Sequence, residues 1–348
     1  MLPLRGGEPP FIFRSDAPNP GPLVNWLSVK NVVIAFLCLA PMALPFLLAT
    51  QGEFPAFAYP VDLPPPPGAR PAPPRDDGTL LRVPESDSAF TRTQIRNTVV
   101  DWHPEDHPPM PDIVAKGREG VRACAWCHLP NGAGRPENTA LAGLTEAYIR
   151  QEVGNFKSGT RKGSEARRAF QAQMNEVAAK VTDADLAEAA KYFASLELGK
   201  FVKVVEAEMV PKTIVKDGLL IKDPAGGEEP IGRRFIEVPD DSEQAENRDP
   251  RTLYTVYVPM GAIDRGKNIV TTGAGKTTVC TTCHGPDLHG AGDIPHIAGR
   301  SPSYVFRQLF DIKANTRTGS VAFMQQVVYG LERDDVIAIA AYLASLEP

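Results

Sequence analysis

Two Cys-x-x-Cys-His pentapeptides contain four of the five cysteines of this chain. One spans residues 124–128, and the other spans residues 280–284, 156 positions further on. Proteins attach haem c through this motif, because each thiol can add to one vinyl group of the porphyrin and the adjacent histidine then lies under the iron. We therefore expect two covalently attached haem c groups. The expected attachment residues and proximal ligands are Cys124, Cys127, His128, Cys280, Cys283 and His284.

Thiol pairs of this spacing have two other common uses. Two pairs can form a four-thiolate zinc site, and a single pair can form a redox-active disulfide. Neither use explains the histidine that directly follows both pairs. The second pair of a zinc ribbon also lies within about 15 to 20 residues of the first, whereas these pairs are far apart. We therefore favour haem attachment over both alternatives.

The two pentapeptides belong to an internal repeat. A shift of 156 residues aligns the first copy with the second, and beyond Gly163 the offset becomes 150 because the first copy has six extra residues. The chain is therefore predicted to contain two homologous haem domains. The aligned positions of the first copy are Cys124, His128, Gly134, Gly143, Tyr148, Phe156, Lys157, Arg161 and Gly163.

Two methionines occupy equivalent positions in the repeats. Met174 aligns with Met324, and both lie downstream of the proximal histidine and before the last predicted helix. A thioether sulfur is soft and neutral, so it favours ferrous iron and raises the reduction potential. We expect Met174 and Met324 to be the sixth ligands of the two irons. The alternative is that each methionine only fills the core.

The periodicity of apolar residues around both motifs is helical. Helices are predicted over 112–122, 146–154 and 183–196 in the first copy, and over 263–270, 302–312 and 333–346 in the second. Thr182 and Asp185 are typical of a helix N-cap with an acidic first turn. Tyr192 and Tyr342 either fill the core or donate a hydrogen bond to a haem propionate.

These features together resemble the class I dihaem cytochromes c of the cytochrome c4 family. The resemblance covers about half the chain, roughly 111–197 and 258–348, and implies two pseudo-symmetric domains that carry single electrons. It also implies that the Pro295 carbonyl accepts a hydrogen bond from the ring of His284, with Thr139 at the matching place in the first domain. The residues that carry the resemblance are the two pentapeptides, Ala142-Gly143, Ala298-Gly299, Tyr148, Tyr304, the run 156–161, Met174, Met324 and the closing helices.

The segment between the haem domains is long and rich in predicted strands. Strands are expected over 202–206, 214–221 and 234–238, and the second contains an Asp-Gly hairpin turn. This connector is interpreted as a β-ribbon that clasps the haem domains, as a docking surface for another subunit, or as a packing appendage.

The N-terminal part contains a 19-residue uncharged apolar run, 32–50. At 1.5 Å per residue it is long enough to cross a membrane, and basic residues precede it. We favour an uncleaved anchor in the bacterial inner membrane, single-pass, with the haem domains in the periplasm. A signal peptide cleaved after Ala58 is the alternative. The proline-rich stretch 60–77 is interpreted either as a stiff spacer or as a passive linker wrapped on a partner.

The predicted fold class is mainly α: two tandem class I cytochrome c domains related by pseudo-symmetry, a short β-rich connector and an N-terminal transmembrane helix. Six parts are predicted. They are a cytoplasmic segment 1–31, the anchor 32–50, a linker and extension 51–110, the first haem domain 111–198, the connector 199–257 and the second haem domain 258–348.

Charge and the remaining histidines exclude some functions. The net charge is −5 and no basic stripe is present, so nucleic acid is not expected as a partner.

His103 and His107 fit a surface proline-rich turn better than a metal site. His289 and His296 are interpreted as surface residues near the second haem.

Three functions fit these features. The first is a respiratory electron carrier between a quinol-oxidising complex and a terminal oxidase. The second is the cytochrome subunit of a membrane-bound dehydrogenase. The third is an enzyme such as a peroxidase, which needs one open iron position; a methionine on each iron counts against it. We therefore expect an electron carrier and not an enzyme.

Overall fold

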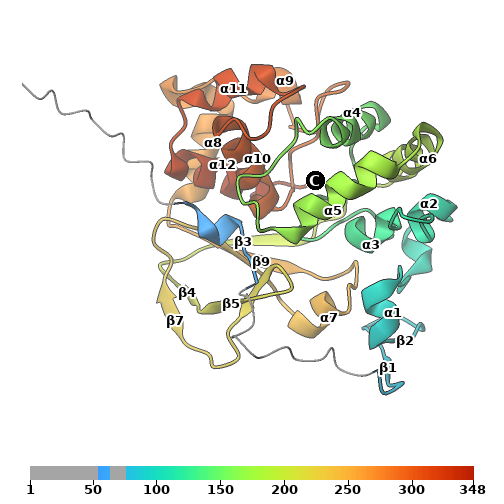
Figure 1. Cartoon of the computed structure of the whole chain (residues 1–348). Helices are drawn as coiled ribbons and strands as arrows, with labels where there is room; N and C mark the ends of the chain where they lie inside the picture. Colours follow the sequence, from blue (N-terminus) through green and yellow to red (C-terminus); the bar gives the residue numbers. More distant parts are fainter. Residues whose placement is uncertain (1–53, 63–75) are drawn as a thin grey trace, which may run out of the picture. The chain divides into compact units, whose positions relative to one another are not determined.

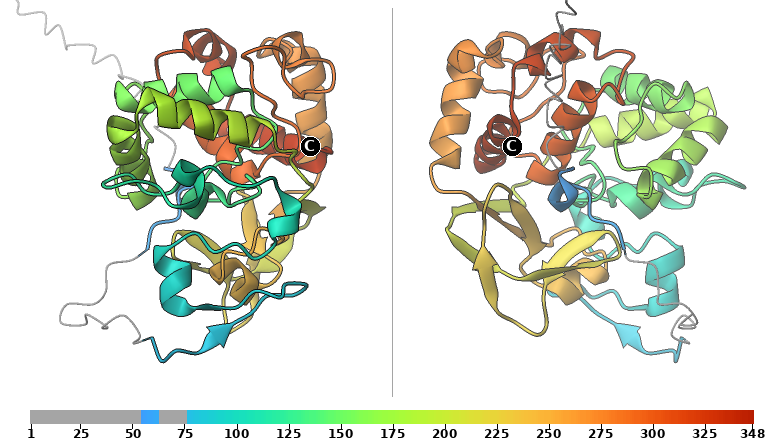
Figure 2. Two further views of the ribbon diagram at one scale, coloured as in Figure 1. Left: turned by 90° about the vertical axis from the view of Figure 1, so that its right-hand side faces the viewer. Right: turned by 60° about the vertical axis from the view of Figure 1, so that its left-hand side comes forward.

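The computed structural model describes residues 54–62 and 76–348, all of which lie in one contact unit, Glu53–Pro348 (Figure 1). The helices of the first haem domain (green) stand beside those of the second (orange and red), and the strands of the connector lie at one end of both groups (Figure 2). The predicted anchor and most of the proline-rich stretch lie outside the described residues.

The two haem domains have the same order of helices. In the first domain these are α2 (Asp112–Ala115), α3 (Cys124–His128), α4 (Glu146–Lys157), α5 (Ala169–Lys180) and α6 (Asp183–Ala194). In the second they are α8 (Ala262–Thr272), α9 (Thr281–His284), α10 (Pro302–Lys313), α11 (Ala322–Tyr329) and α12 (Arg333–Ser345), with a short 3₁₀ turn, η3 (Gly273–Gly275), after α8.

Side-chain caps fix where the middle helices begin. Thr145 accepts a hydrogen bond from the backbone N–H of Tyr148 at 3.2 Å before α4, and Ser301 accepts one from Tyr304 at 3.3 Å before α10. Such caps satisfy backbone donors that the first helical turn leaves unpaired. The caps therefore place Tyr148 and Tyr304, which are repeat equivalents, at matching positions on their helices.

Most predicted helices are confirmed, but not all. The helix predicted over 112–122 ends at Ala115, because Gly117 and Gly120 both have φ of +72°, which a helix does not allow. Helices α5 and α11, which carry the two methionines, were not predicted as helices.

In the second domain α8 packs across α12 at Gly266. A Cβ at this position would collide with the Ala338 carbonyl, so glycine is required for the close approach. Helix α12 is buried on most of its faces, which agrees with its nearly continuous apolar sequence.

The connector forms small sheets instead of one ribbon. Strand β9 (Tyr254–Val258) pairs in parallel with β3 (Val202–Glu206) and antiparallel with β8 (Ile236–Pro239). The Asp217-Gly218 hairpin turn is confirmed between β5 and β6, with φ of +51° and +75°. The other connector elements are β4 (Met209–Pro211), β5 (Thr213–Lys216), β6 (Leu219–Lys222), β7 (Glu228–Pro230) and α7 (Ser242–Glu246).

The connector contacts both haem domains. Arg248 lies 3.9 Å over the ring of Trp126, inside the first pentapeptide, and its guanidinium donates to the Trp126 carbonyl at 2.6 Å. On the other side, the buried carboxylate of Glu237 accepts hydrogen bonds from the Ser301 hydroxyl at 2.8 Å and the Ser303 N–H at 3.1 Å. The connector therefore packs against both haem domains, as expected of either a clasp or a packing appendage.

The residues before the first haem domain also pack on the rest of the chain. The Tyr59 hydroxyl donates to Asp311 at 2.6 Å, and the buried Trp102 indole donates to the Asn247 carbonyl at 2.8 Å. The elements of this part are η1 (Ala56–Ala58), β1 (Leu80–Leu81), β2 (Phe90–Thr91), α1 (Arg92–Asn97) and η2 (Pro104–Asp106).

The predicted fold class is wrong as stated. The structure has 40% helix and 13% strand, because the connector and the extension add strands to the helical domains. In residues 54–62 and 76–348 no helix is long and apolar enough to cross a membrane. The longest of them, α12, has 13 residues and spans roughly 20 Å, against about 30 Å of hydrocarbon. The transmembrane helix and the single-pass inner-membrane location are corrected accordingly.

Candidate functional site

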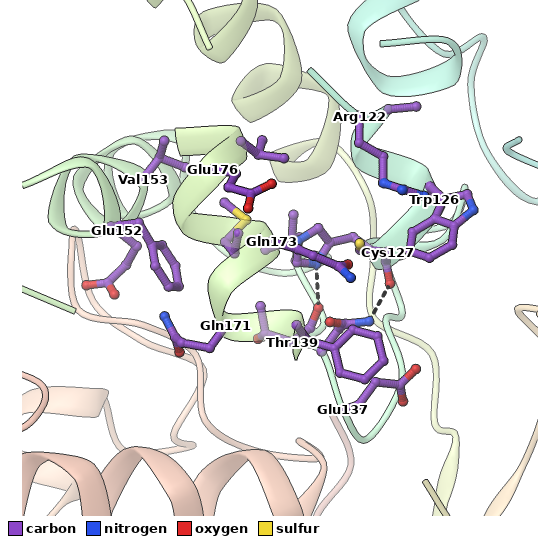
Figure 3. A pocket seen from close by; sticks show the side chains of 18 of the residues that line it. Arg122, Trp126, Cys127, Glu137, Thr139, Glu152, Val153, Gln171, Gln173 and Glu176 are labelled. Atoms are coloured by element: carbon purple, nitrogen blue, oxygen red, sulfur yellow. Dashed lines mark hydrogen bonds between the residues drawn. The ribbon is translucent and has the colours of Figure 1, made fainter. Parts of the chain in front are cut away.

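The first candidate site is a cavity of about 1120 Å³ in the first domain. Helix α3 contributes Cys127 and His128, and α5 contributes Met174, so the pentapeptide and the methionine line the same space. Figure 3 shows Cys127, Thr139 and Glu152 around this cavity. Cys124 lies half-buried against the adjoining hydrophobic core.

A tight turn orients His128. Its ring Nδ1 lies 2.9 Å from the Thr139 carbonyl oxygen, and the N–H of Gly134 donates to the His128 carbonyl at 3.0 Å. Gly134 has φ of +65°, and a Cβ there would collide with the Thr139 carbonyl. Glycine is therefore needed for the loop to bring this acceptor to the histidine.

The second candidate site repeats this arrangement in a cavity of about 420 Å³. Cys280, Cys283 and His284 line it together with Met324 from α11. The His284 Nδ1 lies 2.8 Å from the Pro295 carbonyl oxygen. The expected Pro295 contact is thus present, and Thr139 supplies the same contact in the first domain.

Burial sets the protonation of the two histidines. It lowers the pKa of His128 and His284, although their carbonyl partners act in the opposite direction. A carbonyl can only accept, so each neutral ring carries its proton on Nδ1 and presents the lone pair of Nε2. Each histidine can therefore use Nε2 to bind a metal ion that lies in its cavity.

Among the described residues, the four cysteines of the pentapeptides form no disulfide, so their thiols are available for haem attachment. Burial raises the pKa of the Cys124 thiol to about 12 and that of Cys280 to about 11. Buried thiols of this kind are poor exchange partners, which does not favour a redox disulfide. In the described part of the chain no group of three or more His, Cys, Asp or Glu side chains is arranged to hold a metal ion.

A buried guanidinium also fits haem. Arg300 is 2% exposed and lines the second cavity, and its Nη1 donates to the Ala140 carbonyl at 2.8 Å. Its Nη2 is buried without a hydrogen-bond partner among the described residues. A buried donor of this kind fits a carboxylate such as a haem propionate. Arg300 therefore fits haem in the second cavity, and in both cavities the cysteines, the histidine and the methionine are of the types that hold haem c.

The two cavities share one wall. The wall contains the carboxylate of Glu152, the carboxamide of Gln308 and the phenols of two tyrosines. Arg161 lines the first cavity beside this wall, and Arg317 lines the second. The residues that line both cavities are Thr139, Leu144, Tyr148, Glu152, Tyr304 and Gln308.

Sequence reasoning missed part of this wall. It noted Tyr148, Tyr304 and Arg161 as repeat positions but gave them no role, and it did not single out Glu152 or Gln308. The available signal was the repeat itself, since an offset of 156 places Glu152 on Gln308.

Two histidines are more buried than expected, and Tyr192 takes one of its two expected placements. His103 is not on the surface: it is 1% exposed, and its Nε2 lies 3.1 Å from the Asp249 carboxylate. His296 is half-buried and lines the second cavity, and burial lowers its pKa to about 4. The Tyr192 hydroxyl donates to the Pro130 carbonyl at 2.7 Å, so this residue belongs to the core.

Comparison with known proteins points to one family. The sequence pattern of cytochrome c matches residues 114–197 and 263–347. Cytochrome c4 of Pseudomonas aeruginosa is 26% identical over 238 residues, 67% of this chain and 88% of that protein. Cytochrome c-554(548) of Halomonas halodenitrificans is 34% identical over 77 residues, 22% of this chain and 93% of that protein.

A third relative is named as a subunit. The cytochrome subunit of sulfide dehydrogenase from Chlorobaculum tepidum is 36% identical over 67 residues, 19% of this chain and 59% of that protein.

Proposed function

We propose that this chain, which belongs to the cytochrome c family, carries single electrons through two haem c groups, one in each cavity. Its general character is that of a c4-like electron-transfer cytochrome. We place it in a respiratory chain, between a quinol-oxidising complex and a terminal oxidase.

The protein residues divide the work of holding haem. Cys124 and Cys127 would attach the first group, and Cys280 and Cys283 the second. His128 and Met174 would close the two axial faces of one iron, and His284 and Met324 those of the other. Each repeat would therefore supply one histidine and one methionine as ligands of its own iron.

The observation that carries the proposal is the convergence of ligand types in each cavity. In both domains a histidine from the pentapeptide helix and a methionine from a separate helix line the same space. When bound, haem supplies an iron that gains and loses one electron reversibly. The Thr139 and Pro295 carbonyls hold the rings of His128 and His284 in a fixed orientation, which limits rearrangement when the charge changes.

Apolar side chains dominate the second site. Its cavity is lined on several sides by aliphatic residues, and an apolar surround favours the less charged ferrous state. If His128, Met174, His284 and Met324 hold the two irons as proposed, they would leave no iron position for a substrate, so we propose a carrier and not an enzyme. The aliphatic lining includes Val305, Leu309, Ile312, Val327, Leu331 and Leu343.

A second function is favoured by one relative. Because the match in Chlorobaculum tepidum is named the cytochrome subunit of a dehydrogenase, this chain is alternatively the subunit that accepts electrons from a dehydrogenase partner. Copurification separates the two functions: a dehydrogenase that stays with the haem protein through several columns supports the subunit, and a free cytochrome supports the carrier.

The ferric protein provides the test of the ligand sets. We expect optical and paramagnetic resonance spectra of two low-spin centres with histidine and methionine ligands. A high-spin signal at either centre would contradict the carrier and indicate an open iron position.

A further inference from the structure

A buried polar cluster crosses the boundary between the two haem domains. Arg161 of the first domain donates to the Tyr304 hydroxyl of the second at 3.0 Å, and Arg317 of the second donates to the Tyr148 hydroxyl of the first at 3.2 Å. Each guanidinium therefore binds the phenol of the other domain. The members of the junction cluster form two repeat-related triplets: Tyr148, Glu152 and Arg161, and Tyr304, Gln308 and Arg317.

The backbone beside the junction cluster is reciprocal as well. The Lys162 N–H donates to the Thr316 carbonyl at 3.1 Å, and the Thr318 N–H donates to the Thr160 carbonyl at 2.8 Å. These four residues are also related by the 156-residue offset. The junction thus has local twofold character in both its backbone and its side chains.

The symmetry fails at one pair of side chains. Gln308 accepts hydrogen bonds from Arg161 at 3.2 Å and from Arg317 at 2.9 Å through its amide oxygen. Glu152 accepts from the same two guanidiniums, from Arg317 at 2.9 Å and from Arg161 in a closer contact. The two acceptors share their donors, but one is neutral and the other is a carboxyl group.

Glu152 is held in its charged form. It is 5% exposed, and burial alone would raise its pKa, but the charges of Arg161 and Arg317 outweigh burial and hold the pKa below its ordinary value. Asn155 adds a hydrogen bond to the carboxylate at 3.1 Å, and Ser320 lies close to the same oxygen. An ionised carboxylate therefore lies in the wall that both cavities share.

A fixed negative charge in the shared wall would act on a haem in either cavity. Charges interact strongly where water is excluded, and a carboxylate stabilises ferric iron, which carries one more positive charge than ferrous iron. The carboxylate also offsets part of the charge of two buried guanidiniums.

We propose that Glu152 tunes the electron-transfer centres: its carboxylate lowers the reduction potentials of both haems below the values that a neutral amide, such as that of Gln308, would give. Glu152 is a positioning residue, because it acts through Arg161, Arg317 and the field in the shared wall. The inference rests on the proposed function, since it needs a haem in each cavity.

The first test is Glu152→Gln in the full chain, followed by redox titration of the haem absorption bands. We expect both midpoint potentials to rise, with haem content and low-spin spectra unchanged. The matched control is Glu165→Gln, which removes a carboxylate that is buried to a similar extent and paired with Arg167 but lines neither cavity. The control should shift the potentials much less.

The second test exchanges the two acceptors. The double variant Glu152→Gln, Gln308→Glu returns one carboxylate to the same two guanidiniums, so the potentials should return toward those of the unaltered protein. Unchanged potentials in the single variant overturn the proposal, and so does a single-variant shift that the exchange does not reverse. If the single variant loses haem, the exchanged variant decides: near-original potentials support the proposal, and displaced potentials overturn it. An unaltered protein without two haems would instead refute the proposed function.

Discussion

Met174 and Met324 lie on α5 and α11, and each faces a cavity that also contains the proximal histidine of its own repeat. Thioether ligation raises a haem potential, because sulfur stabilises the ferrous state. The two methionines are therefore the residues on which the proposed potentials depend most.

Met324→Ala should leave the second haem attached, since the thioether bonds to Cys280 and Cys283 do not involve the methionine. We expect the potential of that centre alone to fall by on the order of 0.1 V, because axial ligands set haem potentials over a range of about 0.8 V. Redox titration with haem quantification measures both effects. Met260→Ala is the control, because Met260 is 61% exposed and lines neither haem cavity. Two unchanged potentials in Met324→Ala would remove Met324 as a ligand.

The roles of residues in or near the pentapeptides could be predicted from the sequence. The roles of residues whose partners lie in the other domain could not. The pentapeptides follow from short stretches of sequence and from the repeat, and the Pro295 carbonyl was implied by the resemblance to the cytochrome c4 family. The roles of Glu152 and Arg300 arise only when the domains meet, since their partners, Arg317 and the Ala140 carbonyl, are 165 and 160 positions away. No local pattern encodes such a contact.

At the scale of elements, two helical glycines differ in the space around them, so alanine should have opposite effects on stability at the two positions. Gly266 of α8 has no room for a Cβ because of the Ala338 carbonyl on α12, whereas Gly154 of α4 has no atom within 4 Å. Gly266→Ala should destabilise the protein by about 1–3 kcal/mol through overpacking. Gly154→Ala should stabilise it by about 0.5–1 kcal/mol, because alanine loses less conformational entropy in a helix. Urea unfolding measures both, and equal effects of the two variants would contradict this packing.

The closing helices carry repeat-equivalent carboxylates that bind the opening segments of their domains. Hydrogen bonds from Thr182 and Arg118 lower the pKa of Asp185. For Asp335, burial alone would raise the pKa, but hydrogen bonds from Lys276 and Arg265 outweigh it, and the pKa is again below its ordinary value.

Both carboxylates should therefore support stability in one range of pH. A lowered pKa in the folded state means that the stabilisation is present above the unfolded value of about 3.9 and is lost as the pH falls through the folded value. We expect Tm to fall below about pH 4, and to fall less steeply in the variant Asp185→Asn, Asp335→Asn. Asp112→Asn, which disrupts an exposed pair with Lys116, is the control. If Tm falls as steeply with decreasing pH in the double variant as in the control, the two carboxylates do not have this role.

Helix and strand prediction succeeded where the local pattern was strong. The apolar periodicity of α12 and the Asp217-Gly218 turn were both informative. Helix α5 was missed because polar residues interrupt its apolar positions, as in Gln171, Gln173 and Asn175. Strand β9 was missed because it spans the predicted boundary between connector and second domain, and its parallel partner β3 lies about fifty residues earlier.

At the scale of the whole molecule, one hydrophobic core runs through both haem domains and the connector. Phe193 of the first domain, Val256 of the connector and Ile339 of the second domain belong to the same cluster. Together with the crossed arginines of the junction cluster, this core holds the two cavities against a common wall. A fixed separation between two centres suits repeated exchange of electrons between them.

Membrane attachment was inferred from the hydropathy of residues 32–50 and from the basic residues that precede them. Hydropathy reports the apolar character of a segment but not the helix that would be needed, and within 54–62 and 76–348 no helix could cross a membrane. Domain organisation was more readable, because a repeat of the whole pentapeptide domain is visible in the sequence.

Covalent attachment of haem at both pentapeptides is tested most directly by the intact mass and peptide map of the purified full-length protein. We predict two haems per chain, one on the peptide that contains Cys124 and Cys127 and one on the peptide that contains Cys280 and Cys283. Unmodified thiols at either pair would contradict the assignment of two haem c centres.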